Sequence, residues 1–495
     1  MPRLPVLTYD RGTLILHPPP RGKAWIDFAT WDDRIERFRI PAIHYRELVE
    51  RLHREPTEFE DKARGYQQLA LESRKRRKAY VHQREALAAW KQAGGRGVVV
   101  LPTGSGKTYL AHLVLQEMGR SCLIVVPTLD LMHQWYEQLV AAFPETEIGL
   151  LGGGSRDRSP ILVATYDSAA IHAETLGGKY GGVVFDECHH LPSDFNRVIA
   201  EYAIAPYRLG LTATPERSDG RHEDLTELIG PEVYRKSAED LAGTALADYE
   251  IVRLAVKLTA EERQRYESLI GVRNQFLRDS KIRLGYLQGW QRFVTESARS
   301  PQGRRAMLAH REAKQIALGT EGKLRILIDM LQRHNGERVL IFTNDNATVY
   351  RISQDCLIPA ITHQTPVKER HATLEFFRDG TYKTLVVSHV LNEGVDVPEV
   401  KVAVLLSGTG STREYVQRLG RILRKGTDRS KQAVLYEVIA EDTVEERTSD
   451  RRRGGRRDGD RPKRKGAKQL KLVPKHGGRR AAESTGDWSI DDLPF

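Results

Sequence analysis

Short apolar runs that end at turn residues recur along much of the chain. Residues 97–101 and 182–186 each read as a buried strand, and residues 110–115 have the periodicity of a helix. Four further apolar runs, separated by helical or turn segments, lie at 338–343, 383–388, 402–407 and 432–439. Because short buried strands that alternate with helices are typical of parallel α/β sheets, the pattern predicts two such units in one chain.

The segments around these units have a different pattern. Residues 1–75 combine a predicted strand pair between Leu4 and Leu16 with a helix near residues 45–49. Residues 258–315 read as helical, and basic residues are interleaved there with aromatic ones. This interleaving suits contact with a nucleic-acid backbone and its bases, and it equally suits a helical hairpin with an aromatic core and solvated charges.

Basic residues are concentrated near the C-terminal end of the sequence. The 495 residues carry a net charge of +11, and 14 Lys and Arg against two Asp fall within residues 451–480. A Gly-rich basic segment predicts a disordered tail over 447–495 that tethers nucleic acid through its phosphates, with a solubilising tail as the alternative. Three scattered cysteines and the lack of a long apolar run predict a cytoplasmic protein without membrane contact.

The strongest chemical signal is a phosphate-binding loop at residues 101–108. Its glycines let backbone N–H groups surround phosphate oxygens, Lys107 can reach the β- and γ-phosphates, and the Thr108 hydroxyl can ligate Mg²⁺. A helix is expected to begin at Thr108. The general pattern has glycine where this chain has Leu101. The predicted ATP contacts in the loop are Pro102, Thr103, Gly104, Ser105, Gly106, Lys107 and Thr108.

An apolar strand that ends in two carboxylates predicts a hydrolase. We assign Asp186 to the Mg²⁺ ion and Glu187 to the attacking water. A zinc site at Cys188, His189 and His190 is rejected, because no second pair of residues has zinc spacing. His189 is instead predicted to sense the state of the nucleotide.

A basic helix face is predicted far downstream. Gln417, Arg421 and Arg424 have the spacing i, i+4, i+7 and share one face of a helix. Two arginines on one face suit a γ-phosphate whose charge spreads in the transition state. Such spacing alone is usual for a solvated helix face. Beside a phosphate loop and a Mg²⁺ carboxylate, it favours arginine fingers.

The ordered motifs of the chain resemble those of superfamily 2 helicases, and among these the XPB family in its shorter archaeal and bacterial members. The resemblance covers roughly residues 1–445 and is strongest over 80–235 and 320–440. The matching segments are Gln83 and residues 102–108, 127–130, 164–168, 186–190, 210–214, 341–343, 361–365, 392–398 and 417–424.

This resemblance implies an α/β fold with two RecA-like parallel-sheet motor domains that bind ATP between them. It also implies a small N-terminal α+β domain, a helical thumb-like insert and the disordered basic C-terminal tail. The expected boundaries are 1–75 for the N-terminal damage-recognition-like domain, 76–250 for motor domain 1, 251–318 for the insert, 319–446 for motor domain 2 and 447–495 for the tail.

The family also implies roles for single residues. Gln83 would read the adenine, and Gly394 and Asp396 would contact the nucleotide, with Asp396 near the ribose. The residues that would couple the ATP site to nucleic acid are His189, Thr212, Ala213, Thr214 and Gln417. The expected DNA contacts are Pro127, Thr128, Thr165, Arg217, Asp219 and Thr362. For Pro127, Thr128 and Thr165, ordinary turns at strand ends are the alternative.

Two departures from the family bear on these roles. Before Gln83 many members have Arg and Tyr, where this chain has Tyr80-Val81-His82, so discrimination between bases is expected to be loose. The family's Arg-Glu-Asp triplet, which is linked to duplex opening, reads Arg217-Ser218-Asp219. The missing carboxylate puts strand separation in doubt and leaves the expectation of ATP hydrolysis unchanged.

The predicted function is therefore an ATP- and Mg²⁺-dependent DNA helicase or translocase, with 3′→5′ polarity implied by the family. It would be a nucleoid-associated monomer that acts in DNA repair, such as nucleotide-excision repair, or in duplex opening. Its substrate would be forked, single-stranded or duplex DNA, and the family implies a nuclease partner. The alternatives are a duplex translocase that remodels DNA or drives a nuclease without unwinding, and a nucleotide-switched scaffold.

The last residues of the sequence carry a net negative charge, in contrast to the basic segment before them. Residues 487–495 are acidic and apolar, and Asp491 to Phe495 resemble the C-terminal tip of bacterial single-stranded-DNA-binding proteins. We hypothesise that this tip recruits a partner with a basic-rimmed pocket or folds back onto the basic segment. A chance match is the alternative for so short a segment.

Overall fold

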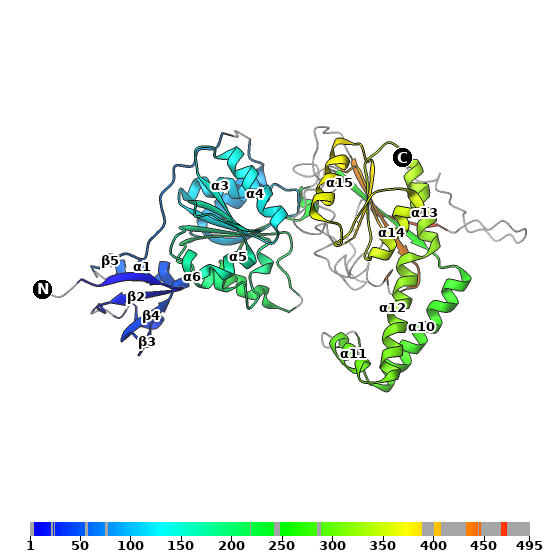
Figure 1. The fold of residues 1–495 in the computed structure, drawn as a ribbon, viewed down its shortest axis with the longest axis horizontal. Coiled ribbons are helices and arrows are strands. Elements are labelled where there is room, and N and C mark those ends of the chain that lie inside the picture. Colours follow the sequence, from blue (N-terminus) through cyan, green and yellow to red (C-terminus); the bar gives the residue numbers. More distant parts are fainter. Residues whose placement is uncertain are drawn as a thin grey trace, which may run out of the picture. The chain divides into compact units, whose positions relative to one another are not determined.

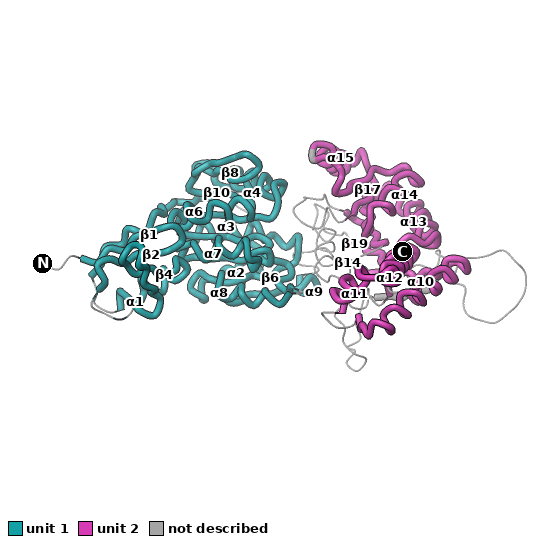
Figure 2. Tube along the Cα trace, turned by 60° about the horizontal axis from the view of Figure 1, so that its bottom comes forward, with its two compact units in different colours: residues 1–246, 393–396 teal, residues 247–392, 397–495 magenta. Residues whose placement is uncertain are grey.

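The computed structural model forms two compact units (Figure 2). Unit 1 comprises residues 1–246 and 393–396, and unit 2 comprises residues 247–392 and 397–495. The residues that the structure describes are 4–20, 23, 25–54, 58–74, 78–217, 219–241, 248–284, 289–388, 400–406, 432–443, 445–446 and 467–472.

Unit 1 begins with a small α+β domain (Figure 1). Its elements are β1 (Val6–Asp10), β2 (Thr13–His17), β3 (Thr30–Asp32), β4 (Arg37–Pro41), α1 (Tyr45–Arg54) and β5 (Glu60–Asp61). The strand order is β3-β4-β2-β1-β5. The β1–β2 hairpin turns at Arg11 and Gly12, both with positive φ, as tight hairpin turns require. Leu7 and Leu14 of the sheet share a buried core with Leu48 of α1.

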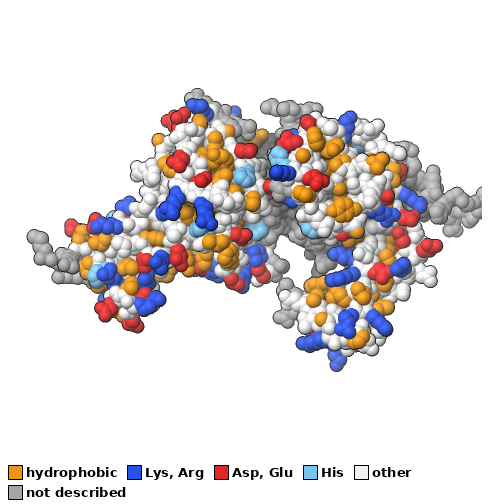
Figure 3. All heavy atoms as spheres, viewed as in Figure 1, with side chains coloured by type: hydrophobic (Ala, Val, Ile, Leu, Met, Phe, Trp, Pro, Cys, Tyr) orange, Lys and Arg blue, Asp and Glu red, His pale blue; other side chains and the backbone are white. Residues whose placement is uncertain are grey.

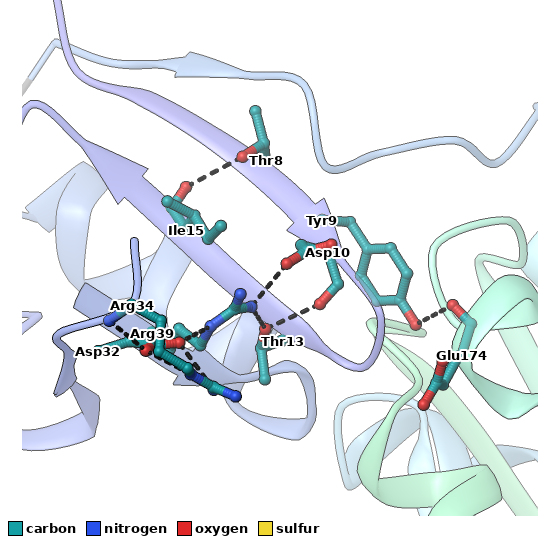
Figure 4. Close-up of polar contacts among 9 residues, drawn as sticks. All are labelled: Thr8, Tyr9, Asp10, Thr13, Ile15, Asp32, Arg34, Arg39 and Glu174. Atoms are coloured by element: carbon teal, nitrogen blue, oxygen red, sulfur yellow. Dashed lines mark hydrogen bonds and ion pairs between the residues drawn. The ribbon is translucent and has the colours of Figure 1, made fainter. Parts of the chain in front are cut away.

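Polar contacts hold the edge of this small sheet and attach it to the rest of unit 1 (Figure 4). The Arg39 guanidinium donates to the carboxylates of Asp10 and Asp32, each at 2.7 Å. The Tyr9 hydroxyl donates to the Glu174 carbonyl oxygen at 3.1 Å. The small domain is therefore fixed to the larger part of unit 1 by hydrogen bonding.

The larger part of unit 1 is an eight-stranded sheet. Its strands are β6 (Arg96–Val100), β7 (Cys122–Val126), β8 (Ile148–Gly152), β9 (Ser155–Arg156), β10 (Ile161–Thr165), β11 (Gly182–Asp186), β12 (Tyr207–Thr212) and β13 (Glu232–Arg235). The order is β13-β6-β12-β11-β7-β10-β8-β9, and only the β8–β9 pair is antiparallel. Every residue of β7 and β11 is buried, as expected for parallel strands with both faces covered.

Helices cover both faces of this sheet, with α3 and α4 on one side and α5 and α6 on the other (Figure 1). The helices are α2 (Val81–Gln92), α3 (Lys107–Met118), α4 (Leu129–Ala142), α5 (Tyr166–Ile171), α6 (Ala173–Leu176), α7 (Val198–Glu201), α8 (Leu225–Leu228) and α9 (Ala238–Leu241). In such doubly wound sheets, ligands bind at the carboxyl ends of the strands.

Unit 2 contains a second parallel sheet, in the order β16-β17-β15-β18-β19-β14-β20. Its strands are β14 (Asp248–Val256), β15 (Val339–Phe342), β16 (Ala360–Ile361), β17 (Thr384–Val387), β18 (Val402–Leu405), β19 (Gln432–Ala440) and β20 (Ala467–Leu472). Three helices of this unit are α13 (Glu321–Arg333), α14 (Asn346–Cys356) and α15 (Val367–Asp379).

Three helices lie between β14 and α13, namely α10 (Ala260–Asp279), α11 (Gly289–Ala298) and α12 (Pro301–Gly319). Thr259 and Glu262 form a capping box that starts α10. Leu277, Phe293 and Ala306 share a small buried cluster that holds the three helices together. Phe293 is the aromatic residue buried in this cluster, whereas Trp290 is 46% exposed. The contact of this segment with DNA stays a prediction.

The two parallel α/β sheets, the N-terminal α+β domain and the helical insert are confirmed. Within the predicted tail, residues 467–472 form β20, which pairs with β14. The predicted boundary at 250/251 falls inside β14, whose nine residues all lie in the second sheet. Across the described ranges, no helix is both long and apolar enough to cross a membrane.

Candidate active site

The predicted phosphate-binding loop connects β6 to α3. Gly104 and Gly106 have φ angles of 84° and 85°, a left-handed conformation that glycine adopts without strain. A Cβ on Gly106 would lie 2.5 Å from the Gln83 Nε2 atom. The loop therefore requires glycine at position 106 for its backbone conformation, and an added Cβ would also displace the amide of Gln83.

Leu101 replaces the first glycine of the general pattern, and its place in the sheet accounts for the difference. The side chain is fully buried. Its N–H donates to the Thr212 carbonyl oxygen at 2.9 Å, which extends the β6–β12 ladder beyond Val100. Leu101 thus belongs to the core of the sheet, and the loop that faces a phosphate begins at Pro102.

Lys107 is the first residue of α3, one position before the predicted helix start at Thr108. Its Nζ atom lies 3.6 Å from Glu187 Oε1 and 3.4 Å from the Leu101 carbonyl oxygen. The Lys107 and Glu187 side chains are only 11% and 13% exposed. The ammonium group therefore lies between the loop and the end of β11, at a helix N-terminus, where both charge and backbone favour a phosphate.

Asp186 ends β11 and is held by donors from two elements. The Trp135 Nε1–H donates to Asp186 Oδ2 at 2.8 Å, and the Glu187 N–H donates to Oδ1 at 3.1 Å. Burial and the charge of Glu187 raise the pKa of Asp186, while Lys107 opposes the shift. A buried, oriented carboxylate beside a lysine is the type of group that carries out chemistry on a phosphate or its metal.

Glu187 is the first residue of a relay, a chain of polar contacts that runs from Glu187 to Thr214 next to the ends of β11 and β12. Its φ is +47°, and its Oε2 atom lies 3.4 Å from the Thr212 hydroxyl and 3.5 Å from His189 Nδ1. His189 Nδ1 and the Thr212 hydroxyl are 3.0 Å apart. The Thr214 N–H donates to the same hydroxyl at 3.2 Å. These contacts connect the predicted water-activating carboxylate to the segment 212–214, both directly at the Thr212 hydroxyl and by way of the His189 imidazole.

Gln83 is buried against the phosphate loop. Its Nε2 donates to the Gly106 carbonyl oxygen at 3.1 Å, and its Oε1 accepts from the Tyr80 N–H at 2.9 Å. Beside it, His82 Nε2 lies 2.9 Å from the Ser105 carbonyl oxygen. Burial lowers the pKa of His82, so the neutral imidazole donates this bond. The amide of Gln83 thus fixes the loop, and its role in reading adenine stays a prediction.

Three of the predicted DNA contacts in unit 1, Pro127, Thr128 and Thr165, lie at or just before helix starts. Thr128 Oγ1 accepts from the Leu131 N–H at 3.2 Å and caps α4. Thr165 Oγ1 accepts from the Ser168 N–H at 3.3 Å and caps α5. Pro127 directly precedes Thr128, and β7 and β10 are neighbours. The three residues therefore lie at one edge of the sheet, with both threonine hydroxyls engaged in capping.

Arg217 is held by Asp219 and by the backbone at His189. It donates to both carboxylate oxygens of Asp219, at 2.9 and 2.6 Å, and to the His189 carbonyl oxygen at 2.6 Å. In unit 2, the buried Thr362 hydroxyl lies 3.1 Å from the Tyr350 hydroxyl. The other predicted site residues lie outside the described residues, and these are Gly394, Asp396, Gln417, Arg421 and Arg424.

Sequence reasoning missed two side chains that shape the site. His82 was read as a departure from a family pattern, whereas it is buried and hydrogen-bonded to the loop. Trp135 lies on α4, 51 positions before its partner Asp186. A tryptophan in the apolar stripe of a helix usually belongs to the core, so the sequence carried no signal for its role.

Comparison with known families assigns three segments of the chain. Residues 7–63 match the Xeroderma pigmentosum group B helicase damage recognition domain. Residues 61–217 match the type III restriction enzyme res subunit, and residues 322–426 match the helicase conserved C-terminal domain. The first match covers the small α+β domain, and the second includes the phosphate loop and the Asp186–Glu187 pair.

Two curated proteins are similar along most of their length. The DNA 3′-5′ translocase XPB2 of Sulfurisphaera tokodaii is 41% identical over 443 residues, which is 90% of this chain and 98% of that protein. The DNA 3′-5′ helicase XPB of Mycobacterium tuberculosis is 30% identical over 454 residues, which is 88% of this chain and 70% of that protein.

Among solved structures, the helicase domain of Pyrococcus furiosus Hef is similar, with a TM-score of 0.52 at 20% identity. The match covers 75% of this chain and 97% of that one. At this identity the likeness shows the fold alone, with two RecA-like parallel sheets in the chain.

Proposed function

This chain belongs to the XPB family of superfamily 2 helicases, and we propose that it is an ATP-driven motor that moves along DNA with 3′-5′ polarity. The observation that carries the proposal is the meeting of Lys107, Asp186 and Glu187 in one buried site at the carboxyl end of β11. A role in DNA repair or duplex opening is supported by the name of a yeast relative, a helicase/translocase subunit of general transcription and DNA repair factor IIH.

Different described residues have different roles in the proposed hydrolysis of ATP. The loop N–H groups and Lys107 bind and orient the β- and γ-phosphates, which positions the terminal phosphate for in-line attack. Glu187, close to Lys107, orients the attacking water and accepts its proton. The loss of the γ-phosphate changes what Glu187 contacts, and the relay through Thr212 transmits that change to residues 212–214.

Mg²⁺ fits the oxygen ligands that this site offers. The Thr108 hydroxyl and the Asp186 carboxylate are hard donors of the kind Mg²⁺ prefers. In the described part of the chain, no group of three or more His, Cys, Asp or Glu side chains is placed to hold a metal ion. Phosphate oxygens and water would therefore complete the coordination of the ion, which supplies charge neutralisation to the transferred phosphoryl group.

The finer parts of the proposal rest on the family resemblance. Arg421 and Arg424 would stabilise the γ-phosphate in the transition state, and Gln417 would couple that contact to DNA. Gly394 and Asp396 would contact the nucleotide. The protein would work as a monomer at the nucleoid, on forked, single-stranded or duplex DNA, with a nuclease as partner.

A duplex translocase that does not unwind is the second candidate. It is favoured by the side chain of Arg217, which is engaged by Asp219 and by the His189 carbonyl oxygen. An arginine held in this way is not free to contact a DNA strand. Comparison of fork unwinding with displacement of a triplex strand separates the two candidates, because a translocase displaces the third strand without separating the duplex.

The proposal is tested by the ATPase rate measured in parallel without polymer and with single-stranded DNA, duplex DNA, forked DNA and RNA. We expect the greatest stimulation from forked DNA and no turnover by Lys107→Ala under any of the five conditions. Stimulation by RNA alone would overturn the substrate assignment. A Glu187→Gln variant that retains cellular activity without hydrolysis would instead support a scaffold.

A further inference from the structure

A groove between α11 and α12 presents apolar side chains to solvent. It has a volume of about 650 Å³ and is lined by Trp290, Val294 and Leu308. These residues are 46%, 44% and 63% exposed, respectively. The Trp290 ring packs against Phe293 and His310, which holds one side of the groove in place. Single exposed apolar residues are ordinary, whereas three that line one groove indicate a docking surface.

The rim of this groove is basic. Arg304, Arg311 and Lys314 line it, and no Asp or Glu does. Within the described ranges, neither the Arg311 nor the Lys314 side chain makes an ion pair or hydrogen bond. Burial, with the charges of Arg273 and Lys314, lowers the pKa of His310 to about 4, so the imidazole is neutral at physiological pH. Figure 3 shows the same mixture of apolar and basic side chains over the α10–α12 part of unit 2.

We propose that the acidic and apolar segment 487–495 of this same chain docks in the α11–α12 groove. The segment carries the acids Asp487, Asp491 and Asp492 and the apolar residues Trp488, Ile490, Leu493, Pro494 and Phe495. Its apolar side chains match the floor of the groove, and its carboxylates match the rim. A nucleic-acid strand would use the basic rim, but its phosphates offer no aliphatic partner for Val294 and Leu308.

The chain is long enough to reach the groove. Leu472, at the end of β20, pairs with Val256, and Leu258, two residues further on, packs against Ala317 near the end of α12. From Ala317 to Arg304 the helix rises about 20 Å at about 1.5 Å per residue. The 14 residues 473–486 span up to about 45 Å when extended. The segment 487–495 can therefore lie along the groove without strain in the connection.

Docking is tested with a fluorescent peptide of residues 487–495, titrated against two full-length chains. One chain is wild type, and the other carries Trp488→Ser, Leu493→Ser and Phe495→Ser. We expect the substituted chain to bind the peptide at least about tenfold more tightly, because a tethered tip competes at an effective concentration on the order of 1 mM.

Further substitutions in the substituted chain identify the surface. Leu308→Glu and Arg311→Glu should each weaken peptide binding about tenfold, by loss of apolar contact or by like-charge repulsion. The controls are Ile328→Glu and Arg325→Glu on α13, which change another exposed apolar residue and another exposed arginine of unit 2. Both controls should leave peptide binding unchanged.

Three results would overturn the proposal. The first is equal affinity of the peptide for the wild-type and tip-substituted chains. The second is peptide binding that survives both Leu308→Glu and Arg311→Glu, which would place the tip on the basic segment 451–480 instead. The third is a Leu308→Glu variant that weakens DNA binding alone, which would make the groove a nucleic-acid site.

Discussion

At the scale of single residues, the orientation of one carboxylate depends on one indole nitrogen. Trp135 Nε1 holds Asp186 Oδ2 at 2.8 Å within the buried site. Since burial raises the pKa of Asp186, donors that favour its charged form matter for its readiness to bind a cation. Trp135 is therefore a positioning residue that acts through Asp186.

Trp135→Phe tests this role. The substitution retains an aromatic ring and removes the donor, so we expect kcat for ATP hydrolysis to fall about 10- to 100-fold and the Mg²⁺ concentration for half-maximal rate to rise. The matched control is Trp90→Phe, which removes another buried indole bond, to the Arg208 carbonyl oxygen. That variant should lose stability while its Mg²⁺ dependence stays at the wild-type value. An equal change of Mg²⁺ dependence in both variants would refute the role of Trp135.

A second prediction at this scale concerns Gly106, the residue that precedes α3. Gly106→Ala places a Cβ 2.5 Å from Gln83 Nε2 in a left-handed conformation, so we expect ATP affinity to fall at least about tenfold as the loop is displaced. Gly154→Ala is the control, because it has the same sign of φ and nothing within 4 Å of the added Cβ. It should cost about 1–2 kcal/mol of stability without altering ATP binding. Calorimetric titration measures the ATP affinity of both variants. Unchanged affinity in Gly106→Ala would contradict the account.

The sequence could predict the site residues whose roles follow from their immediate neighbours in the chain. Lys107 follows a loop whose glycine spacing fixes its geometry, and Asp186 and Glu187 end an apolar strand. The partners His82 and Trp135 could not be predicted, because their contacts arise when distant elements pack together. Gln83 was named through the family, and the structure adds that its amide holds the loop.

At the scale of elements, one buried ion pair attaches α13 to the segment after β19. Lys323 Nζ lies 2.6 Å from Glu445 Oε2 and also donates to the Leu406 carbonyl oxygen. The two side chains are only 2% and 3% exposed. A buried charge is tolerated only while its partner is present. The attachment of α13 to the segment after β19 therefore depends on both Lys323 and Glu445.

Glu445→Ala should therefore destabilise the protein by about 3–5 kcal/mol, because it leaves a buried ammonium without its carboxylate. Glu321→Ala, which removes an exposed partner of Arg325 on the same helix, should cost less than about 0.5 kcal/mol. Urea unfolding compares the two variants. If Lys323→Met with Glu445→Leu fails to recover stability lost in Glu445→Ala, the loss does not come from the unpaired charge.

The elements themselves were predictable where a strand is wholly apolar. The runs at 338–343 and 383–388 contain β15 and β17, because buried parallel strands have few polar positions. No such run marks β14, because Glu250 and Arg253 interrupt its apolar pattern. The strand β20 lies in a basic, Gly-rich segment whose composition favours disorder, so its pairing could not be predicted from composition.

At the scale of the whole molecule, the central claim is that ATP hydrolysis needs groups from both units. Unit 1 supplies the phosphate loop and the carboxylates, as its geometry shows. Unit 2 has no phosphate loop in its sequence, so its proposed share is the arginine pair at 421 and 424. If the proposed arginine pair contributes in this way, binding and loss of one nucleotide would couple to motion of the two units.

The most direct test is the DNA-stimulated kcat of Arg424→Ala, measured beside Arg418→Ala. Both remove one arginine from the same predicted helix, but Arg418 lies off the face that Gln417, Arg421 and Arg424 share. The account predicts that Arg424→Ala lowers kcat about 1,000-fold or more with ATP still bound, and that Arg418→Ala stays within about threefold of wild type. A kcat for Arg424→Ala close to that of Arg418→Ala would contradict a site completed by unit 2.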